Sequence, residues 1–243
     1  MKKLGLFISL FILVNSIAAE EKLLLRFPSL NNNGSLIAFS FQGDIWTVPS
    51  SGGKAVRLTV HDAYEAYPKF SPDGKQIAFS GARYGNNDIF VVSTEGGTPK
   101  RLTYHSSQDL ISSWDNNGNI IFSTNREFNQ IERPSEVYSI SATGGTEKRI
   151  LDAVGFDPII SQDGRFIAFV RGDINPIPRE NYRGSSNRDI WLFDTKTKKY
   201  SRLTDFSAND IYPQWQDSRT LYFLSSNSGH YNLYKVKIND DGT

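Results

Sequence analysis

Acidic side chains recur at one position of this sequence, each followed by an apolar residue and an aromatic one. They are Asp44, Asp88, Glu136 and Asp189. Two carboxylates can hydrolyse a glycosidic bond, but only when they converge across one cleft. Each of these acids belongs to a separate repeat of the chain, so we expect no shared cleft. We expect each to begin a strand and to bond nearby backbone or an arginine such as Arg83, Arg126 or Arg171.

The sequence has three histidines and no cysteine. His61 and His105 occupy equivalent places in successive repeats, and His230 falls in a different kind of loop. Because repeats separate them and no carboxylate spacing supports a site, we predict neither a metal site nor another cofactor. Turn formation accounts for His61 and His105 more simply, although both stay on our list of candidate contacts for a peptide or partner.

Several catalytic motifs are absent from the sequence. It contains no G-x-S-x-G elbow, no H-E-x-x-H helix, no P-loop and no dinucleotide fingerprint. We therefore predict that this chain carries no catalytic residue. With 27 basic and 26 acidic residues the net charge is only +1, which gives no electrostatic reason to expect nucleic acid.

Residues 1–19 have the three parts of a secretory signal peptide. Lys2 and Lys3 precede the apolar run Leu4–Val14, and the small residues Ser16–Ala19 follow it. We predict cleavage after Ala18 or Ala19 and export to the periplasm. The run is shorter than the roughly 20 apolar residues of a spanning helix, which argues against the alternative of an uncleaved anchor. No later segment is long enough to cross a membrane.

One unit repeats through the rest of the chain. An Asn-Gly or Asp-Gly turn precedes an apolar triplet, then come an acid-apolar-aromatic triplet, a Gly-Gly turn and an Arg-Leu-Thr-like stretch. The apolar triplets are typical of strands buried on both faces. They end at Phe39, Phe79, Phe122, Phe169 and Phe223.

The repeat length of roughly 40 to 50 residues is that of a four-stranded propeller blade. We therefore predict an all-β fold, a β-propeller with four complete blades and a partial fifth. The mature domain covers residues 20–243, with blades at about 27–65, 66–108, 109–155, 156–211 and 212–243. We expect an arc of an incomplete, six-bladed ring. The alternative is a closed five-bladed ring in which residues 23–27 supply a missing strand.

The loops between the second and third strands differ most in length, and the longest spans residues 170–188. Variable loops on a rigid scaffold commonly bind ligands. Because arginine pairs well with carboxylates, this loop is a candidate wall for peptides or a partner domain. The alternative is a solvated loop packed over a neighbouring blade. Its candidate residues are Arg171, Arg179, Tyr182, Arg183 and Arg188.

The amino-acid sequence of the repeat is similar to the propeller repeats of TolB and of tricorn-type peptidases. Phe70–Lys75 leading into Ile77–Phe79 carries the general likeness. The stretches 41–59, 83–106 and 181–192 resemble bacterial tricorn-like peptidases more closely, and the likeness covers the whole mature chain.

The resemblance implies an exported serine peptidase whose second propeller, PDZ domain and catalytic region follow this segment. It further implies that the propeller filters or guides peptides or docks the downstream peptidase domains, with a homo-oligomer as a further possibility. No catalytic residue is carried over, because the family's catalytic motif matches nothing here. The alternatives are a free-standing TolB-like envelope module and a prolyl-oligopeptidase-type propeller. A TolB-like protein would have a separate α/β domain before its propeller, whereas blade one here follows the signal.

Overall fold

The computed structural model describes residues 24–127, 135–172, 187–205, 208–240 and 242, so the predicted signal peptide lies outside the described residues. The first blade consists of β1 (Arg26–Leu30), β2 (Leu36–Phe41), β3 (Asp44–Pro49) and β4 (Val56–Arg57). The second consists of β5 (Glu65–Phe70), β6 (Gln76–Gly81), β7 (Asp88–Ser93) and β8 (Lys100–Arg101). The third consists of β9 (Leu110–Trp114), β10 (Asn119–Thr124), β11 (Glu136–Ser141) and β12 (Lys148–Arg149).

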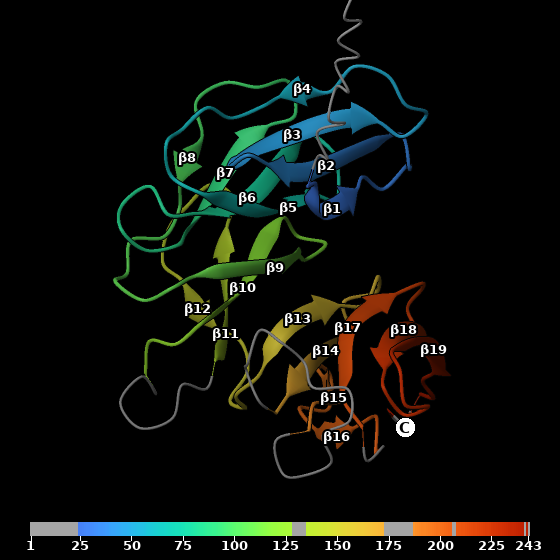
Figure 1. Ribbon diagram of the computed structural model, residues 1–243. Coiled ribbons are helices and arrows are strands. Elements are labelled where there is room, and N and C mark those ends of the chain that lie inside the picture. The colour runs from blue at the N-terminus through green and yellow to red at the C-terminus, as the bar shows by residue number, and fades with distance from the viewer. Residues whose placement is uncertain (1–23, 128–134, 173–186, 206–207, 241, 243) are drawn as a thin grey trace, which may run out of the picture.

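The fourth blade consists of β13 (Phe156–Ile160), β14 (Phe166–Arg171), β15 (Asp189–Asp194) and β16 (Tyr200–Arg202). The fifth has three strands, β17 (Asp210–Trp215), β18 (Thr220–Ser225) and β19 (Asn232–Lys237). Within every blade the strands pair antiparallel in chain order. The predicted fold, a propeller with four complete blades and a partial fifth, is confirmed, and the described residues form no helix (Figure 1).

Each blade packs against the next one along the chain. The first strand of a blade contacts three strands of the preceding blade, as β5 does with β1, β2 and β3. In the described part of the chain, the fifth blade makes no comparably extensive contact with the first. β1 pairs with β2 as the first strand of its own blade, so the alternative in which it completes the last blade is wrong. The six-bladed ring stays a prediction. No described helix is long and apolar enough to span a membrane.

The apolar triplets form the centres of the blades. Phe79, Phe122 and Phe169 are fully buried, because a middle strand of a blade is covered on both faces by neighbouring blades. Four apolar clusters follow the four blade boundaries. One of them joins Ala78 and Ile89 of the second blade to Ile111 and Phe122 of the third. The hydrophobic core is therefore divided among the boundaries.

Buried acids lie beside the first strand at three of these boundaries. They are Glu65, Asp109 and Asp210, here called the inner acids, and each has no exposed surface. Glu65 accepts a hydrogen bond from the Thr59 hydroxyl of the preceding blade and pairs with Arg83 of its own blade. Asp109 likewise pairs with Arg126 at 2.8 Å. A buried carboxylate needs such partners to offset its lost hydration.

The boundary between the third and fourth blades has no inner acid. Leu151 stands where Thr59 stands in the first blade, and Gly155 replaces the acid. Leu151 and the Phe169 ring pack in one apolar cluster there. A β-carbon on Gly155 would lie 2.4 Å from Cδ2 of Phe169 and 2.9 Å from the Val170 carbonyl oxygen. The aromatic ring therefore fills the space that a side chain occupies at the other boundaries.

We expect Gly155→Ala to lower the free energy of unfolding by about 1–3 kcal/mol, because the added methyl overpacks this boundary. Urea denaturation followed by circular dichroism measures the change. The double variant with Phe169→Leu, which shortens the obstructing side chain, should be less destabilised than the two single changes predict together. Simple additivity would show that the ring is not the obstacle.

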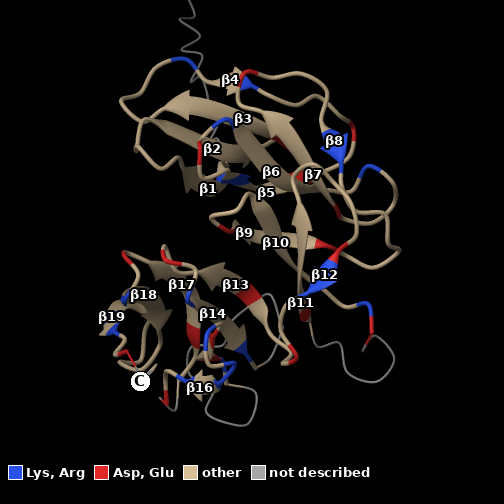
Figure 2. Cartoon of the chain, turned by 180° about the vertical axis from the view of Figure 1, so that it is seen from behind, with Lys and Arg blue, Asp and Glu red and all other residues tan. Residues whose placement is uncertain are grey.

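The four recurring acids are structural and begin the third strands of their blades, next to fourth strands such as β8 and β12 that carry basic residues (Figure 2). Asp88 pairs with Arg101 and Asp189 with Arg202, both at 2.8 Å. Asp44 pairs with Arg57, and Glu136 accepts the backbone N–H groups of residues 126 and 127. The expected backbone bonds are present, but the charged partners of the three aspartates are not the expected arginines. They are Arg57, Arg101 and Arg202, which stand in the short fourth strands. Each lies opposite the aromatic residue two positions after the acid, as Arg57 lies opposite Trp46.

Candidate binding site at the mouth of the propeller axis

The first strands of the blades line the propeller axis, and the pairing register of every first strand shifts by one residue at the same place. In β1, β5, β13 and β17 one residue at this shift has a left-handed backbone, and a proline follows it in each case. These residues, here called the collar, are Phe27, Tyr67, Asp157 and Tyr212, with φ of 53°, 60°, 50° and 53°. Non-glycine residues rarely adopt such φ values. Because the left-handed conformation recurs at the same position of four blades, the fold itself requires it there.

The collar side chains from different blades converge. The Phe27 and Tyr67 ring centroids are 4.0 Å apart. The pKa of Tyr67 is raised, mainly by burial and further by the charge of Asp157, while Arg26 opposes the rise. Tyr67 is 36% and Tyr212 55% exposed, so both rings remain accessible to a ligand. The collar is thus an aromatic constriction with one carboxylate.

Basic side chains surround that carboxylate. Burial raises the pKa of Asp157, and the charges of Lys69 and Arg188 oppose the rise. Burial also lowers the pKa of Lys69, against the attraction of Asp157. No ion pair within 4.0 Å joins Lys69 to Asp157 in the described part of the chain. One acid therefore faces two bases at this end of the axis.

A cavity of about 370 Å³ opens beside the collar. Leu110, Ile111 and Phe156 supply apolar walls, and Tyr67 and Asp157 border it. The hydroxyls of Ser123 and Thr124 also line it, and both are buried without a hydrogen-bond partner. Unsatisfied buried hydroxyls in a partly apolar cavity are available to a ligand's polar groups.

The structure places the predicted site residues in different surroundings. Arg188 is 6% exposed and its guanidinium lies 5.4 Å from the centre of the Phe156 ring, beside the collar. Arg171 stacks 4.7 Å over Trp191 in the same blade. His61 and His105 are exposed, and the Nδ1 atom of each accepts the N–H two residues ahead. Arg179, Tyr182 and Arg183 lie outside the described residues. The role of all seven in binding stays a prediction.

Sequence reasoning missed the collar itself. Its signal is the dipeptide of a collar residue and proline, which recurs as Phe27-Pro28, Tyr67-Pro68, Asp157-Pro158 and Tyr212-Pro213. The third blade departs from it, with Ile111-Ser112 at that position and no positive φ. A β-branched residue adopts a left-handed backbone only at high cost.

The opposite end of the axis holds a second cavity, of about 740 Å³. Several of its amides are already used between blades: Asn116 donates to the Gln162 carbonyl, and Gln162 donates to the Gln216 carbonyl at 3.2 Å. These bonds tie the turns of successive blades together. Among the described residues, no cluster of histidines and carboxylates has the arrangement of a metal site.

Comparisons with known proteins agree with this architecture. The chain is 27% identical over 210 residues to a tricorn protease homolog of Saccharolobus solfataricus, and 28% identical over 219 residues to tricorn protease homolog 1 of Streptomyces coelicolor. These matches cover 84% and 86% of this chain but only 19% of each relative. The chain therefore spans about a fifth of the length of these relatives.

Solved structures show the same fold. The crystal structure of the tricorn protease superposes with a TM-score of 0.75 and 21% identity, over 88% of this chain and 21% of that one. A putative TolB from Agrobacterium tumefaciens gives 0.71 and 19% identity, over 90% of this chain and 78% of that one. The model of the tricorn protease N-terminal β-propeller domain matches residues 22–243. This chain belongs to the family of tricorn protease N-terminal β-propeller domains.

Proposed function

We propose that this chain is the non-catalytic N-terminal propeller of an exported tricorn-like serine peptidase, and that it guides peptides along its axis. The collar carries this proposal. It combines accessible aromatic rings, a carboxylate near Lys69 and Arg188, and a cavity whose Ser123 and Thr124 hydroxyls have no partner. Those features suit an extended chain, because rings contact side chains of many kinds while hydroxyls bond to backbone amides.

Peptide photo-crosslinking tests the role of the collar. An unstructured peptide with a benzophenone side chain should form adducts mainly on Tyr67 and Tyr212, located by mass spectrometry. The double variant Tyr67→Ala, Tyr212→Ala should lower the adduct yield at least about fivefold, because two stacking surfaces are lost. Tyr104→Ala is the matched control, since Tyr104 is exposed on an outer loop. Adducts spread evenly over the surface, or an equal loss in the control, would contradict the proposal.

A free-standing TolB-like module is the second candidate, favoured by the match that extends over 78% of the putative TolB chain. The mass of the native polypeptide separates the two. An immunoblot band above roughly 100 kDa, several domains in size, supports the peptidase. A band near the 27.4 kDa of this chain supports the module.

A further inference from the structure

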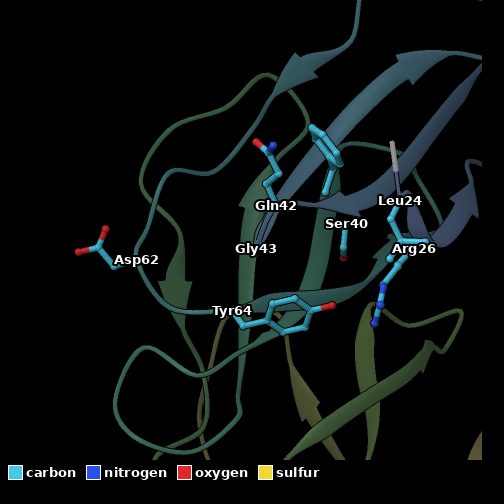
Figure 3. A pocket seen from close by; sticks show the side chains of 8 residues that line it. Leu24, Arg26, Ser40, Gln42, Gly43, Asp62 and Tyr64 are labelled. Atoms are coloured by element: carbon cyan, nitrogen blue, oxygen red, sulfur yellow. The ribbon is translucent and has the colours of Figure 1, made fainter. Parts of the chain in front are cut away.

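A third cavity, of about 640 Å³, lies at the boundary between the first and second blades (Figure 3). The turn between β2 and β3 forms one of its walls and Tyr64 another. Gln42 and Gly43 both have positive φ, 51° and 89°, as a two-residue hairpin turn requires. The Glu65 N–H donates to the Gly43 carbonyl at 2.8 Å, which fixes the turn against the second blade.

The cavity is open because the turn between β2 and β3 is short. In the second blade, the connection between β6 and β7 runs from residue 82 to 87, whereas β2 and β3 are joined by two residues. The cavity therefore depends on a local sequence feature of the first blade and not on the general form of a propeller.

One buried hydroxyl in this cavity has no partner. Ser40 is 2% exposed, and its Oγ atom makes no hydrogen bond. The equivalent Ser80 of the next blade accepts the Ile111 N–H at 2.9 Å. In Figure 3 the Ser40 side chain points into the cavity, toward the Tyr64 ring. The serine hydroxyl at this position has a hydrogen-bond partner in the second blade and none in the first, so the Ser40 hydroxyl can form a hydrogen bond with a ligand.

Two further donors stand near this hydroxyl. The Arg26 side chain is exposed and lines the cavity, and no ion pair within 4.0 Å joins it to an acid among the described residues. The Tyr64 phenol, on a side chain 48% exposed, extends toward Arg26 in Figure 3. Asp62 stands at the far end of the cavity and points away from this group. Leu24, Phe41 and the Tyr64 ring provide the apolar surface.

We infer that this cavity binds a carboxylate at the end of an apolar group. Arg26 pairs with the carboxylate, the Ser40 and Tyr64 hydroxyls donate to it, and the apolar walls cover the attached group. The carboxyl terminus of a peptide and a free small acid share this chemistry. The site lies next to the collar, because Arg26 precedes Phe27 and its charge acts on Tyr67, but it does not rest on the proposed peptidase role.

Titration with N-acetylphenylalanine and with its amide, followed by NMR shifts of Leu24 and Tyr64, tests the inference on the purified protein. The acid should bind with a dissociation constant on the order of 1 mM, as its size allows. The amide should bind at least about tenfold more weakly, because it lacks the charge that Arg26 recognises. Equal binding of acid and amide would overturn the inference.

Variants locate the carboxylate. Arg26→Gln should weaken binding of the acid about tenfold, and Ser40→Ala about threefold. Lys54→Gln removes one charge from an exposed turn of the same blade and serves as the matched control; it should leave binding unchanged. An unaffected Arg26→Gln variant would overturn the site. A pentapeptide with a free terminus that binds more tightly than the small acid identifies a peptide as the source, and the reverse order identifies a free acid.

Discussion

Replacing Arg83 with alanine is expected to lower the free energy of unfolding by about 3–5 kcal/mol at neutral pH. The change leaves the fully buried Glu65 without its charged partner, because the Arg83 side chain is only 12% exposed and pairs directly with that acid. It also removes the guanidinium that lies 5.0 Å from the centre of the Phe90 ring. Urea denaturation of the two proteins measures the difference.

Arg57→Ala is the matched control. Arg57 pairs with Asp44, but its side chain is 43% exposed, so hydration replaces much of the lost interaction. We expect a loss of about 1 kcal/mol or less. Similar losses in the two variants would show that burial of the pair does not set its importance.

The pH dependence gives an independent check of the charge on Glu65. Burial raises the pKa of Glu65, while the Thr59 hydrogen bond and Arg83 oppose the rise. A group with a raised pKa contributes stability below its unfolded pKa and loses it as the pH rises through the folded one. Without Arg83 the stability lost on ionisation of Glu65 is larger. The difference in free energy of unfolding between Arg83→Ala and the parent protein should therefore shrink at acidic pH. A constant gap would assign the effect to packing alone.

Asp210→Asn is expected to raise the free energy of unfolding by roughly 3 kcal/mol at pH 7. Asp210 is the inner acid of the fifth blade, fully buried, and neither carboxylate oxygen has a hydrogen bond of normal geometry. Asn227 stands four residues after Phe223, where the second and third blades have Arg83 and Arg126 four residues after their phenylalanines. Burial therefore raises the pKa of Asp210 to about 6, opposed by the Ser225 and Thr204 hydroxyls.

The sign of the effect follows from that pKa. Asp210 in the unfolded chain has a pKa of 3.8, below its folded value. Its contribution to stability is fully present below about pH 4 and is lost as the pH rises through about 6. Asparagine cannot ionise, so the advantage of the variant should grow between pH 4 and 7.

Denaturation at several pH values measures this advantage. Asp163→Asn is a control in which the change in stability should have the opposite sign. Burial would raise the pKa of Asp163, but hydrogen bonds from Ser161 and Arg219 outweigh burial and lower that pKa to about 2. Its substitution should destabilise the protein at neutral pH. If the difference in free energy of unfolding between Asp210→Asn and the parent did not change with pH, Asp210 would not ionise with a raised pKa as we expect.

The repeat allowed the blades to be predicted because each apolar triplet and each turn is a local signal. Arg188 was selected for its charge within a long loop, and it does lie beside the axis. The collar escaped sequence reasoning because its residues differ in chemistry: Phe27 and Asp157 share a backbone conformation, not a side-chain type. A position that is set by backbone conformation does not require one type of side chain. The shared sequence feature of the collar is therefore the proline that follows each residue.

The pairing of acids with arginines was only half predictable. The recurrence of Asp44, Asp88 and Asp189 was visible, but several arginines follow each of them. The correct partner stands thirteen residues later in each of these three blades, a distance set by the return of the chain through the turn into the fourth strand. The inner acids Glu65, Asp109 and Asp210 each stand six residues after the threonine of the Arg-Leu-Thr stretch. Sequence reasoning overlooked this regular spacing because one of the acids is a glutamate and the residues around them differ.

The apolar boundary between the third and fourth blades divides the arc into parts that respond differently to acid. At the boundaries that hold Glu65 and Asp210, whose pKa values burial raises, proton uptake neutralises a carboxylate and alters the balance of burial and pairing. Leu151, Gly155 and Phe169 carry no titratable group, so the apolar interior of that boundary takes up no proton, and the acid nearest to it in the first strand of the fourth blade is Asp157 of the collar. The packing at the centre of this boundary therefore depends less on pH than the packing around Glu65 and Asp210.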